Sequence, residues 1–361
     1  MRGAVTLAVE QLRREVAGGI GTYTRGLIAG LAALGDDAPP LRLRASRPPR
    51  GPDPLAQFGL ALETSPLSSR VLVAAWQAGL CPVRSGALTH AVSLAAPPSR
   101  PPLVVTVHDL AFRALPETFP PRGRRWHEAA LRRALGKAAA FVVPSAAVAG
   151  ALVAAGAPAD AVRVIPEGAD HLPAPDLRAA DDLLGRLSVT GPFFLAVGTL
   201  EPRKNLGGLV AAYARARGAL PEPWPLVVVG PAGWGPSASG LARVPGVVLA
   251  GRVGDGLLAG LYARARVVCY VPLLEGFGLP VAEAMHAGVP VVASDVPSAA
   301  GAALGVDPRD ARSVASGLVA AATDDALRAR LVAAGRARAA ELSWKACAAA
   351  HVALWAEVVA R

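Results

Sequence analysis

The segment EGFGLPVAEAM places two carboxylates, Glu275 and Glu283, eight positions apart on either side of a glycine-bearing turn. Pro280 suits the first position of a helix, where its missing N–H costs no hydrogen bond. We therefore expect a loop up to residue 278, a helix directly after it, and Glu283 in the first helical turn. A helix N-terminus attracts phosphate and hydroxyl oxygens, and each carboxylate can accept hydrogen bonds from hydroxyl groups. Taken alone, the pattern also fits a carboxylate that caps its own helix beside a solvated turn residue.

Two cations form a second candidate group. Arg203 and Lys204 occur in TLEPRKN, shortly after the apolar run FFLAVG, which is typical of a buried strand. A loop at the carboxyl end of a parallel strand points into the crevice where α/β sheets bind ligands. The pair could neutralise a diphosphate there, whereas on an ordinary surface it would only be solvated.

Glycines and a histidine follow two earlier apolar runs. Gly18, Gly19 and Gly21 precede an expected helix over residues 23–34, so their backbone amides could cradle phosphates. His108 ends the strand-like run LVVTV, which places an imidazole at the carboxyl end of a strand. A glycine cluster can also simply form a turn, and a histidine at a strand end can be a structural group.

The chain contains no D-x-D triplet, and its three cysteines, at 81, 269 and 347, lack metal-like spacing. We therefore expect no metal site and no cofactor. Two of the cysteines lie in apolar surroundings that suit buried thiols in a reducing compartment. The N-terminal apolar run is interrupted by Glu10 too early for a signal peptide, so we expect a cytoplasmic protein.

The length of 361 residues allows two domains of ordinary size. Short Val- and Leu-rich runs alternate with Ala-rich helical stretches, as in doubly wound parallel α/β folds. Prolines and charges before FFLAVG indicate a domain break. We predict an N-terminal domain over 1–172, a linker over 173–190, a second domain over 191–340 and a closing amphipathic helix over 341–361. The stretch 138–161, uncharged except for Asp160, is divided by Pro144 and Ser145 into a strand, a turn and a helix, so we predict no transmembrane helix.

The formal charge of +10 suggests binding to nucleic acid, but the chain has no aromatic pairs of the kind found in RNP motifs, no zinc-finger spacing and no recognition helix to support it. We expect no nucleic-acid partner. A basic segment over 120–137 could instead rest peripherally on anionic lipid, or could be a solvated helix face. Its residues for such contact are Arg124, Arg125, Trp126, Arg132 and Arg133.

Five segments follow one another along nearly the whole chain. They are VAGGIGTYTRGL (16–27), VVTVHDLAF with PETF (104–119), FVVPSAAVAGALVAAGAP with VRVIPEGAD (141–170), the stretch from LAVGTLEPRKN (195–216), and the stretch that ends in LLEGFGLPVAEAM (247–285). In this order they resemble the signature of retaining glycosyltransferases of the GT-B fold. The family is the large family 4, which contains bacterial mannosyltransferases and glucosyltransferases.

The resemblance implies two Rossmann-like domains with an interdomain cleft, the first facing the acceptor and the second binding a nucleotide sugar, and a terminal helix that crosses back to the first domain. It implies that Lys204 binds phosphate, and that Arg203 shares this role because Thr199 stands where many relatives carry an arginine. His108 would contact the donor sugar and stabilise charge.

The remaining site residues are also assigned by resemblance. Glu275 would bind the sugar hydroxyls together with the amides that follow it, and Glu283 would bind the ribose hydroxyls. The further donor-binding residues implied are Gly18, Gly19, Gly21, Thr199, Gly276, Phe277, Gly278 and Leu279.

The sequence thus predicts a metal-independent, retaining transfer of a hexose from a GDP- or UDP-sugar to a hydroxyl acceptor, which could be lipid-linked. The PRKN form resembles relatives that use GDP-mannose, which favours mannose. Two alternatives remain open. One is a GT-B enzyme of other chemistry, such as a sugar-nucleotide epimerase or a phosphorylase; the other is a catalytically silent binding subunit.

Overall fold

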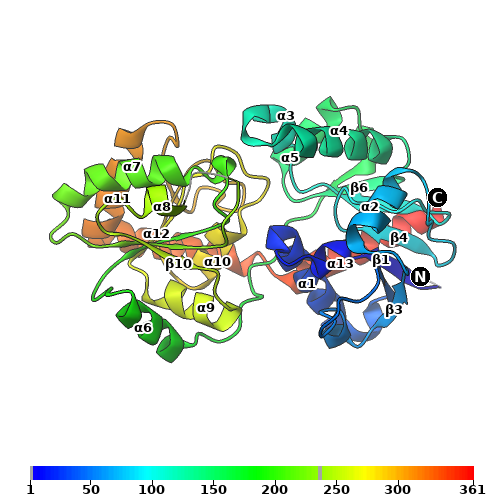
Figure 1. Cartoon of the computed structure of the whole chain (residues 1–361), viewed down its shortest axis with the longest axis horizontal. Coiled ribbons are helices and arrows are strands. Elements are labelled where there is room, and N and C mark those ends of the chain that lie inside the picture. Colours follow the sequence, from blue (N-terminus) through cyan, green and yellow to red (C-terminus); the bar gives the residue numbers. More distant parts are fainter. Residues whose placement is uncertain (1–2, 235–237) are drawn as a thin grey trace. The chain divides into compact units, whose positions relative to one another are not determined.

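The computed structural model describes residues 3–234 and 238–361. These residues form two compact units (Figure 1). Unit 1 consists of Met1–Gly168 with Trp344–Arg361, and unit 2 consists of Ala169–Ser343. The second unit is therefore inserted, in chain order, between the main part of the first and the C-terminal helix.

Unit 1 is built on a parallel sheet whose seven described strands have the order β3-β2-β1-β4-β5-β6-β7. Apolar runs such as LVVT and AFVV are buried throughout, as expected for central strands covered on both faces. The strands are β1 Val5–Ala8, β2 Leu41–Ala45, β3 Ala61–Thr64, β4 Leu88–Ala91, β5 Leu103–Thr106, β6 Ala140–Val143 and β7 Val162–Val164. The α-helices are α1 Gly18–Ala32, α2 Ser69–Gln77, α3 Ala111–Ala114, α4 Pro121–Leu135, α5 Ala146–Ala154 and α13 Trp344–Ala360.

Unit 2 contains a second parallel sheet, in which the six described strands have the order β10-β9-β8-β11-β12-β13. Apolar clusters cover the sheet, with Leu226 and Val228 in one and Val227 and Val229 in the other. The strands are β8 Phe194–Val197, β9 Leu226–Val229, β10 Val247–Gly251, β11 Val267–Tyr270, β12 Val291–Ala293 and β13 Leu304–Gly305. The α-helices are α6 Leu177–Arg186, α7 Leu206–Ala216, α8 Ala238–Leu241, α9 Asp255–Arg264, α10 Leu279–His286, α11 Ala311–Thr323 and α12 Asp325–Ala340.

The expected fold class, two doubly wound α/β domains with parallel sheets, is confirmed. The stretch 138–161 also forms the expected strand and helix, β6 and α5. Within the part of the chain that the structure describes, no helix combines the length and the apolar character needed to cross a membrane.

Two local expectations differ from the structure. The first helix begins at Gly18 rather than at Tyr23. The amide of Gly21 donates to the carbonyl of Ala17 at 3.1 Å, and a Cβ atom at Gly21 would lie 2.3 Å from Cβ of Ala17, so glycine fits there despite its low helix propensity. The segment 173–190, which we expected to be a linker, contains α6. Asp176 caps this helix, and Ala180 and Leu184 on its buried face join the core of unit 2.

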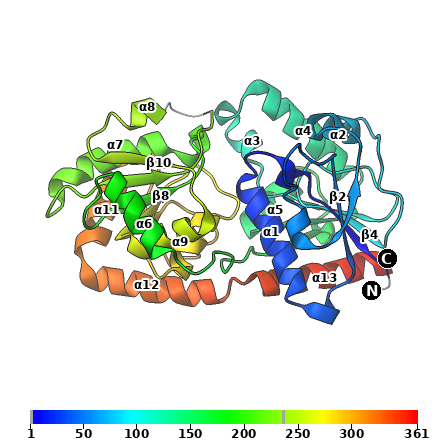
Figure 2. The same cartoon turned by 60° about the horizontal axis from the view of Figure 1, so that its bottom comes forward.

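The C-terminal helix α13 lies beside α1 in unit 1 (Figure 2). Two glycines of α1 permit this close approach. A Cβ atom at Gly26 would lie 2.1 Å from Cε2 of Trp344, and one at Gly30 would lie 2.1 Å from the carbonyl oxygen of Trp344. Any larger residue at either position would force the two helices apart.

Candidate functional site

In the sheet of unit 2 the strand order reverses between β8 and β11. Strands β9 and β10 are added on the outer side of β8, and strands β12 and β13 are added on the outer side of β11. Ligands of doubly wound folds bind at such a point, beyond the carboxyl ends of the strands. The loop after β8 contains Arg203 and Lys204, and the loop after β11 contains Glu275. Because the two strands are parallel neighbours, these loops meet at the same edge of the sheet.

Lys204 and Glu275 are in direct contact there. The Nζ atom of Lys204 lies 2.5 Å from Oε2 of Glu275 and donates to the hydroxyl of Tyr270 at 2.6 Å, and that hydroxyl donates to the same carboxylate oxygen at 2.6 Å. Arg203 lies 3.3 Å from the other oxygen of Glu275 and 2.9 Å from Glu201. Two cations and two carboxylates thus form one compact cluster.

The cluster is mostly removed from solvent, with side-chain exposures of 13% for Arg203, 14% for Lys204 and 11% for Glu275. Burial raises the pKa of Glu275, but the charges of Lys204 and Arg203, with the hydrogen bonds from Lys204 and Tyr270, lower it well below its ordinary value. Burial and the charge of Glu275 raise the pKa of Tyr270. Glu275 is therefore a carboxylate at neutral pH, and Tyr270 is a neutral hydroxyl that donates to it.

Glu283 belongs to a separate buried group within unit 2. Its Oε2 accepts a hydrogen bond from the hydroxyl of Tyr262 at 2.7 Å, and its Oε1 lies 3.1 Å from Nε2 of His171. Our expectation that Glu283 lies in the first turn of its helix was wrong: α10 begins at Leu279, so Glu283 is the fifth residue and lies in the second turn. It therefore does not cap the helix.

The loop between Glu275 and α10 is buried at Gly276 and Phe277, and so is Leu279, the first residue of α10. Gly278 has a left-handed backbone with φ of 98°, and a Cβ atom there would lie 2.1 Å from Cγ1 of Val296. The backbone turn and the contact with Val296 thus explain Gly278 without a ligand. On the other side of the cluster, the half-buried Thr199 forms a tight turn, in which its carbonyl oxygen accepts from the amide of Glu201 at 2.8 Å.

In the sheet of unit 1 the strand order reverses in the same way between β1 and β4. A cavity of about 570 Å³ lies there, lined by residues that follow β1, β4 and β5, among them Arg14, Ser93 and His108. The glycines of the first motif begin the adjacent helix α1: Gly18 and Gly19 are exposed, and Gly21 is packed against Ala17.

Both ring nitrogens of His108 face acceptors. Nε2 donates to the carbonyl of Val92 at 2.9 Å, and Nδ1 lies 3.3 Å from Oε1 of Glu167. Burial lowers the pKa of His108, but the hydrogen bond and charge of Glu167 and the carbonyl of Val92 raise it above its ordinary value. The imidazolium form is thereby stabilised. The ring is also fixed by Tyr23, which packs edge-on with 4.7 Å between ring centroids.

Sequence reasoning missed four residues that hold the candidate site residues in place: Tyr270, Tyr262, His171 and Glu167. Tyr270 ends strand β11, so the strand-end argument used for Lys204 could have identified it. The other three offer no comparable signal, because each lies far along the chain from the residue it contacts. Among the described residues, no group of three or more His, Cys, Asp or Glu side chains is arranged to hold a metal ion.

The two units share their architecture with solved structures of other proteins. HepE of Anabaena, whose structure was determined in complex with UDP and glucose, gives a TM-score of 0.73 at 20% identity, covering 98% of this chain and 99% of that chain. Sucrose-phosphate synthase of Thermosynechococcus elongatus gives 0.74 at 23% identity, covering 99% and 100%. The fold is the GT-B fold of glycosyltransferases.

The sequence matches two family models along most of its length. The model described as Glycosyltransferase Family 4 matches residues 17–171, and the model described as Glycosyl transferases group 1 matches residues 191–324. O-antigen chain mannosyltransferase B of Escherichia coli is 31% identical over 265 residues, which are 68% of this chain and 67% of that protein. The chain belongs to glycosyltransferase family 4 and is a glycosyltransferase.

Proposed function

We propose that the protein transfers a hexose from a nucleoside diphosphate sugar to a hydroxyl acceptor, with retention of the anomeric configuration and without a metal ion. The observation that carries this proposal is the cluster of Lys204, Arg203 and Glu275 at the point where the strand order of the sheet in unit 2 reverses. Buried cations in that position can take the charge of a leaving diphosphate.

The cluster gives the donor phosphates and the sugar separate partners. A diphosphate bound by Lys204 and Arg203 replaces Glu275 as their counter-charge, and Glu275 is then free to accept hydrogen bonds from the sugar hydroxyls. Glu283, held by Tyr262 and His171, binds the ribose hydroxyls. Thr199, Gly276, Phe277, Gly278 and Leu279 complete the donor-binding residues of unit 2.

In the reaction, the bond from C1 of the sugar to the diphosphate oxygen breaks and a bond from C1 to the acceptor oxygen forms. The acceptor proton passes to the leaving diphosphate, so no protein base is required. In this proposal His108 contacts the sugar as a fixed imidazolium that stabilises charge, and Gly18, Gly19 and Gly21 offer amides to phosphate.

Mannose is the preferred sugar in this proposal, since the relative named above is a mannosyltransferase. UDP is a further candidate because HepE, a protein of the same fold, was solved with UDP.

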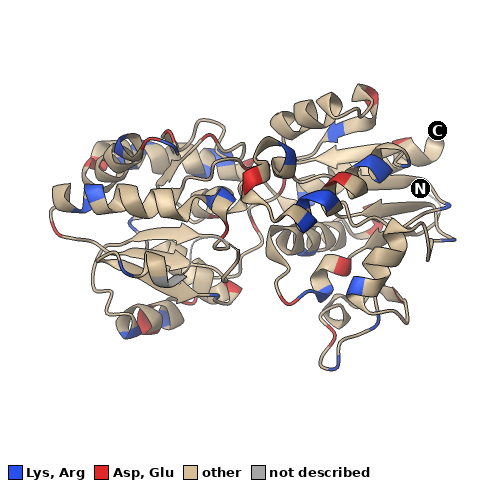
Figure 3. Ribbon diagram, turned by 45° about the horizontal axis from the view of Figure 1, so that its top comes forward, with Lys and Arg blue, Asp and Glu red and all other residues tan. Residues whose placement is uncertain are grey.

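Peripheral membrane contact through α4 rests on Arg124, Arg125 and Arg132, which are exposed. Trp126 is half-buried and Arg133 donates to the carbonyl of Gln77, so these two contribute less to such a surface. Figure 3 shows basic and acidic residues interspersed along the elements of each unit, which gives no support to nucleic-acid binding.

A panel of UDP-, GDP-, ADP- and dTDP-sugars tests the proposal. One donor is expected to raise the melting temperature and, with a hydroxyl acceptor, to give a product with the same anomeric configuration in the presence of a chelator. Lys204→Met is expected to reduce donor affinity at least tenfold, a loss of about 1.4 kcal/mol or more. Lys345→Met, on the exposed side of α13, is the matched control and is expected to bind like the wild type. Binding of no nucleotide sugar by the wild type would refute the proposal.

A further inference from the structure

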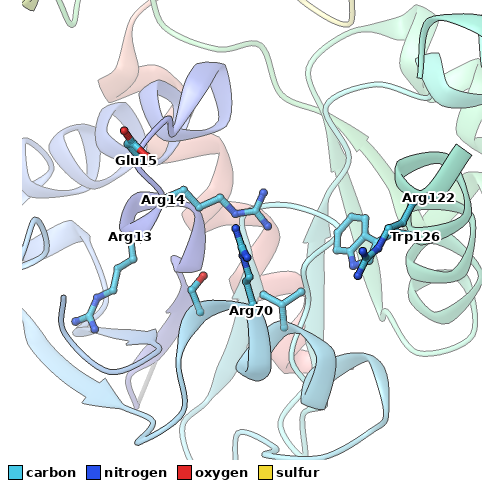
Figure 4. Close-up of a pocket in the computed structure, with 8 residues that line it drawn as sticks. Arg13, Arg14, Glu15, Arg70, Arg122 and Trp126 are labelled. Atoms are coloured by element: carbon cyan, nitrogen blue, oxygen red, sulfur yellow. The ribbon is translucent and has the colours of Figure 1, made fainter. Parts of the chain in front are cut away.

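A second cavity, of about 600 Å³, lies in unit 1 and is lined by four arginines and an indole ring (Figure 4). The arginines are Arg13, Arg14, Arg70 and Arg122, and the indole belongs to Trp126. The catalytic assignments above use none of these side chains, so their gathering in one cavity needs its own explanation.

Arg13 has a structural role. Its guanidinium pairs with Asp53 at 2.5 Å, its side chain is only 2% exposed, and it points away from the other arginines in Figure 4. The guanidinium groups of Arg14 and Arg70 instead point toward one another. Within residues 3–234 and 238–361, no hydrogen bond or ion pair is made by the side chain of Arg14, Arg70 or Arg122.

The nearby carboxylates compensate the charge of this group only in part. Glu15 lines the cavity, but its carboxylate lies on the side of Arg14 away from Arg70 (Figure 4). Glu10 attracts Arg14 electrostatically, but among the described residues it forms no ion pair with Arg14, Arg70 or Arg122. Converging cations without a matching anion repel each other, and an anionic ligand would remove this cost.

Helix stability does not explain the arginines either. Arg70 lies in the first turn of α2 and Arg122 in the first turn of α4. A cation in the first turn is unfavourable because the helix dipole is positive at that end. Both arginines therefore cost helix stability where they stand, and they face the cavity.

The cavity also adjoins the His108 pocket. Arg14, Arg122 and Trp126 line both cavities. A ligand with an anionic group among the arginines can therefore extend past Trp126 into the pocket that contains His108. Trp126 offers an aromatic face to the carbon skeleton between the two ends.

We propose that this cavity binds a phosphoryl group carried by the acceptor, with Arg14, Arg70 and Arg122 as its ligands and the reacting hydroxyl of the acceptor in the His108 pocket. A phosphate fits this site because its oxygens accept paired hydrogen bonds from planar guanidinium groups. The inference rests on the proposed function, because it defines the class of acceptor for that reaction. The phosphoryl group can come from a soluble sugar phosphate or from the headgroup of a phospholipid.

The test measures acceptor and donor binding separately. Binding of glucose 6-phosphate is compared with that of glucose, and binding of vesicles that contain phosphatidylglycerol is compared with that of phosphatidylcholine vesicles. At least one of the phosphate carriers is expected to bind tenfold or more tightly than its neutral counterpart. Arg70→Gln and Arg122→Gln are each expected to remove most of that difference, whereas Arg84→Gln, an exposed arginine outside the cavity, is expected to retain it.

The donor-induced melting shift is recorded for the same variants and is expected to be unchanged. Preference for glucose 6-phosphate identifies a soluble acceptor, and preference for phosphatidylglycerol vesicles alone identifies a lipid; both support the inference. The inference is overturned if neither carrier is preferred, or if Arg70→Gln and Arg122→Gln bind it like the wild type. Normal donor binding in that case would leave the proposed function standing, whereas absence of donor binding by the wild type would refute that function.

Discussion

Glu275 has two roles in the proposed reaction that a substitution can separate. Without a ligand its carboxylate neutralises Lys204 and Arg203, and in the donor complex it binds the sugar. Glu275→Gln keeps the size of the side chain and removes the charge. We expect the nucleoside diphosphate alone to bind as tightly as in the wild type or more tightly, because it no longer competes with a carboxylate for the two cations.

Turnover in the same variant is expected to fall at least tenfold, a loss of about 1.4 kcal/mol or more of transition-state stabilisation. Calorimetry with UDP and GDP and steady-state kinetics measure the two effects. Wild-type turnover, or nucleotide binding weakened as strongly as in Lys204→Met, would contradict the separation of roles.

Tyr262 positions the carboxylate that we assign to the ribose. Tyr262→Phe removes the hydroxyl that donates to Glu283 at 2.7 Å and leaves the buried ring in place. We expect the KM for the donor to rise three- to tenfold, because the lost hydrogen bond orients Glu283 and does not itself reach the donor, and we expect kcat to stay within about twofold. Tyr213→Phe is the control, since it removes a buried hydroxyl of unit 2 that donates to the carbonyl of Trp224. A rise of KM in both variants would indicate general loosening of the unit.

Helix α1 shows how a small residue can serve packing in this protein. Gly26→Ala adds a Cβ atom 2.1 Å from the ring of Trp344 on α13. Alanine favours a helix over glycine by about 1 kcal/mol, but overpacking costs about 1–3 kcal/mol, so we expect net destabilisation. Gly150→Ala, in α5, is the matched control because its Cβ would contact nothing within 4 Å. Thermal unfolding should show a lower melting temperature for Gly26→Ala and an equal or higher one for Gly150→Ala.

The sequence predicts the strands for a physical reason, whereas it assigns Lys204 and Glu275 to one site only through the family resemblance. Buried parallel strands form continuous apolar runs, and the loops that follow neighbouring strands must meet at one edge of the sheet. The start of α1 and the helix α6 within the expected linker were not predictable in this way. Propensity and proline content are local signals, and in α6 the contacts of Ala180 and Leu184 with the core of unit 2 decide the structure.

The contacts of Glu283 show the same limit. It is held by Tyr262 from α9 and by His171 from a loop more than a hundred positions earlier in the chain. No spacing rule connects such positions, because their proximity depends on how the whole of unit 2 folds. The roles that the family resemblance implies for the site residues stay predictions, and the experiments above test them.

Unit 1 as a whole contains a buried histidine network that links its sheet to α13. Nε2 of His351 lies 2.8 Å from the hydroxyl of Tyr23, which also lies 3.0 Å from Oγ1 of Thr106, and His90 lies 2.8 Å from the same Oγ1. Burial lowers the pKa of His351 to about 4, although its hydrogen bond to the carbonyl of Cys347 raises it. Burial and the neighbouring histidines lower the pKa of His90 well below its ordinary value.

These shifts predict a loss of stability between pH 6.5 and 4. In that range the unfolded chain takes up protons on His351 and His90 while the folded chain does not, so the free energy of unfolding falls as the pH falls. For His351 alone the loss reaches roughly 3 kcal/mol near pH 4. His108 has the opposite sign: because its pKa is raised, its contribution is complete below pH 6.5 and is lost only as the pH rises above that value.

Urea unfolding followed by tryptophan fluorescence at pH 4.5, 5.5 and 7 measures this dependence, and a substitution assigns it. His351→Gln cannot take up a proton in either state, so the unfolding midpoint of this variant should vary less with pH than that of the wild type, even if the variant is less stable at pH 7. His286→Gln, at the exposed end of α10, should keep the wild-type dependence. Equal pH dependence in the wild type and in His351→Gln would show that the buried imidazole between Tyr23 and Cys347 is not the group that titrates on unfolding.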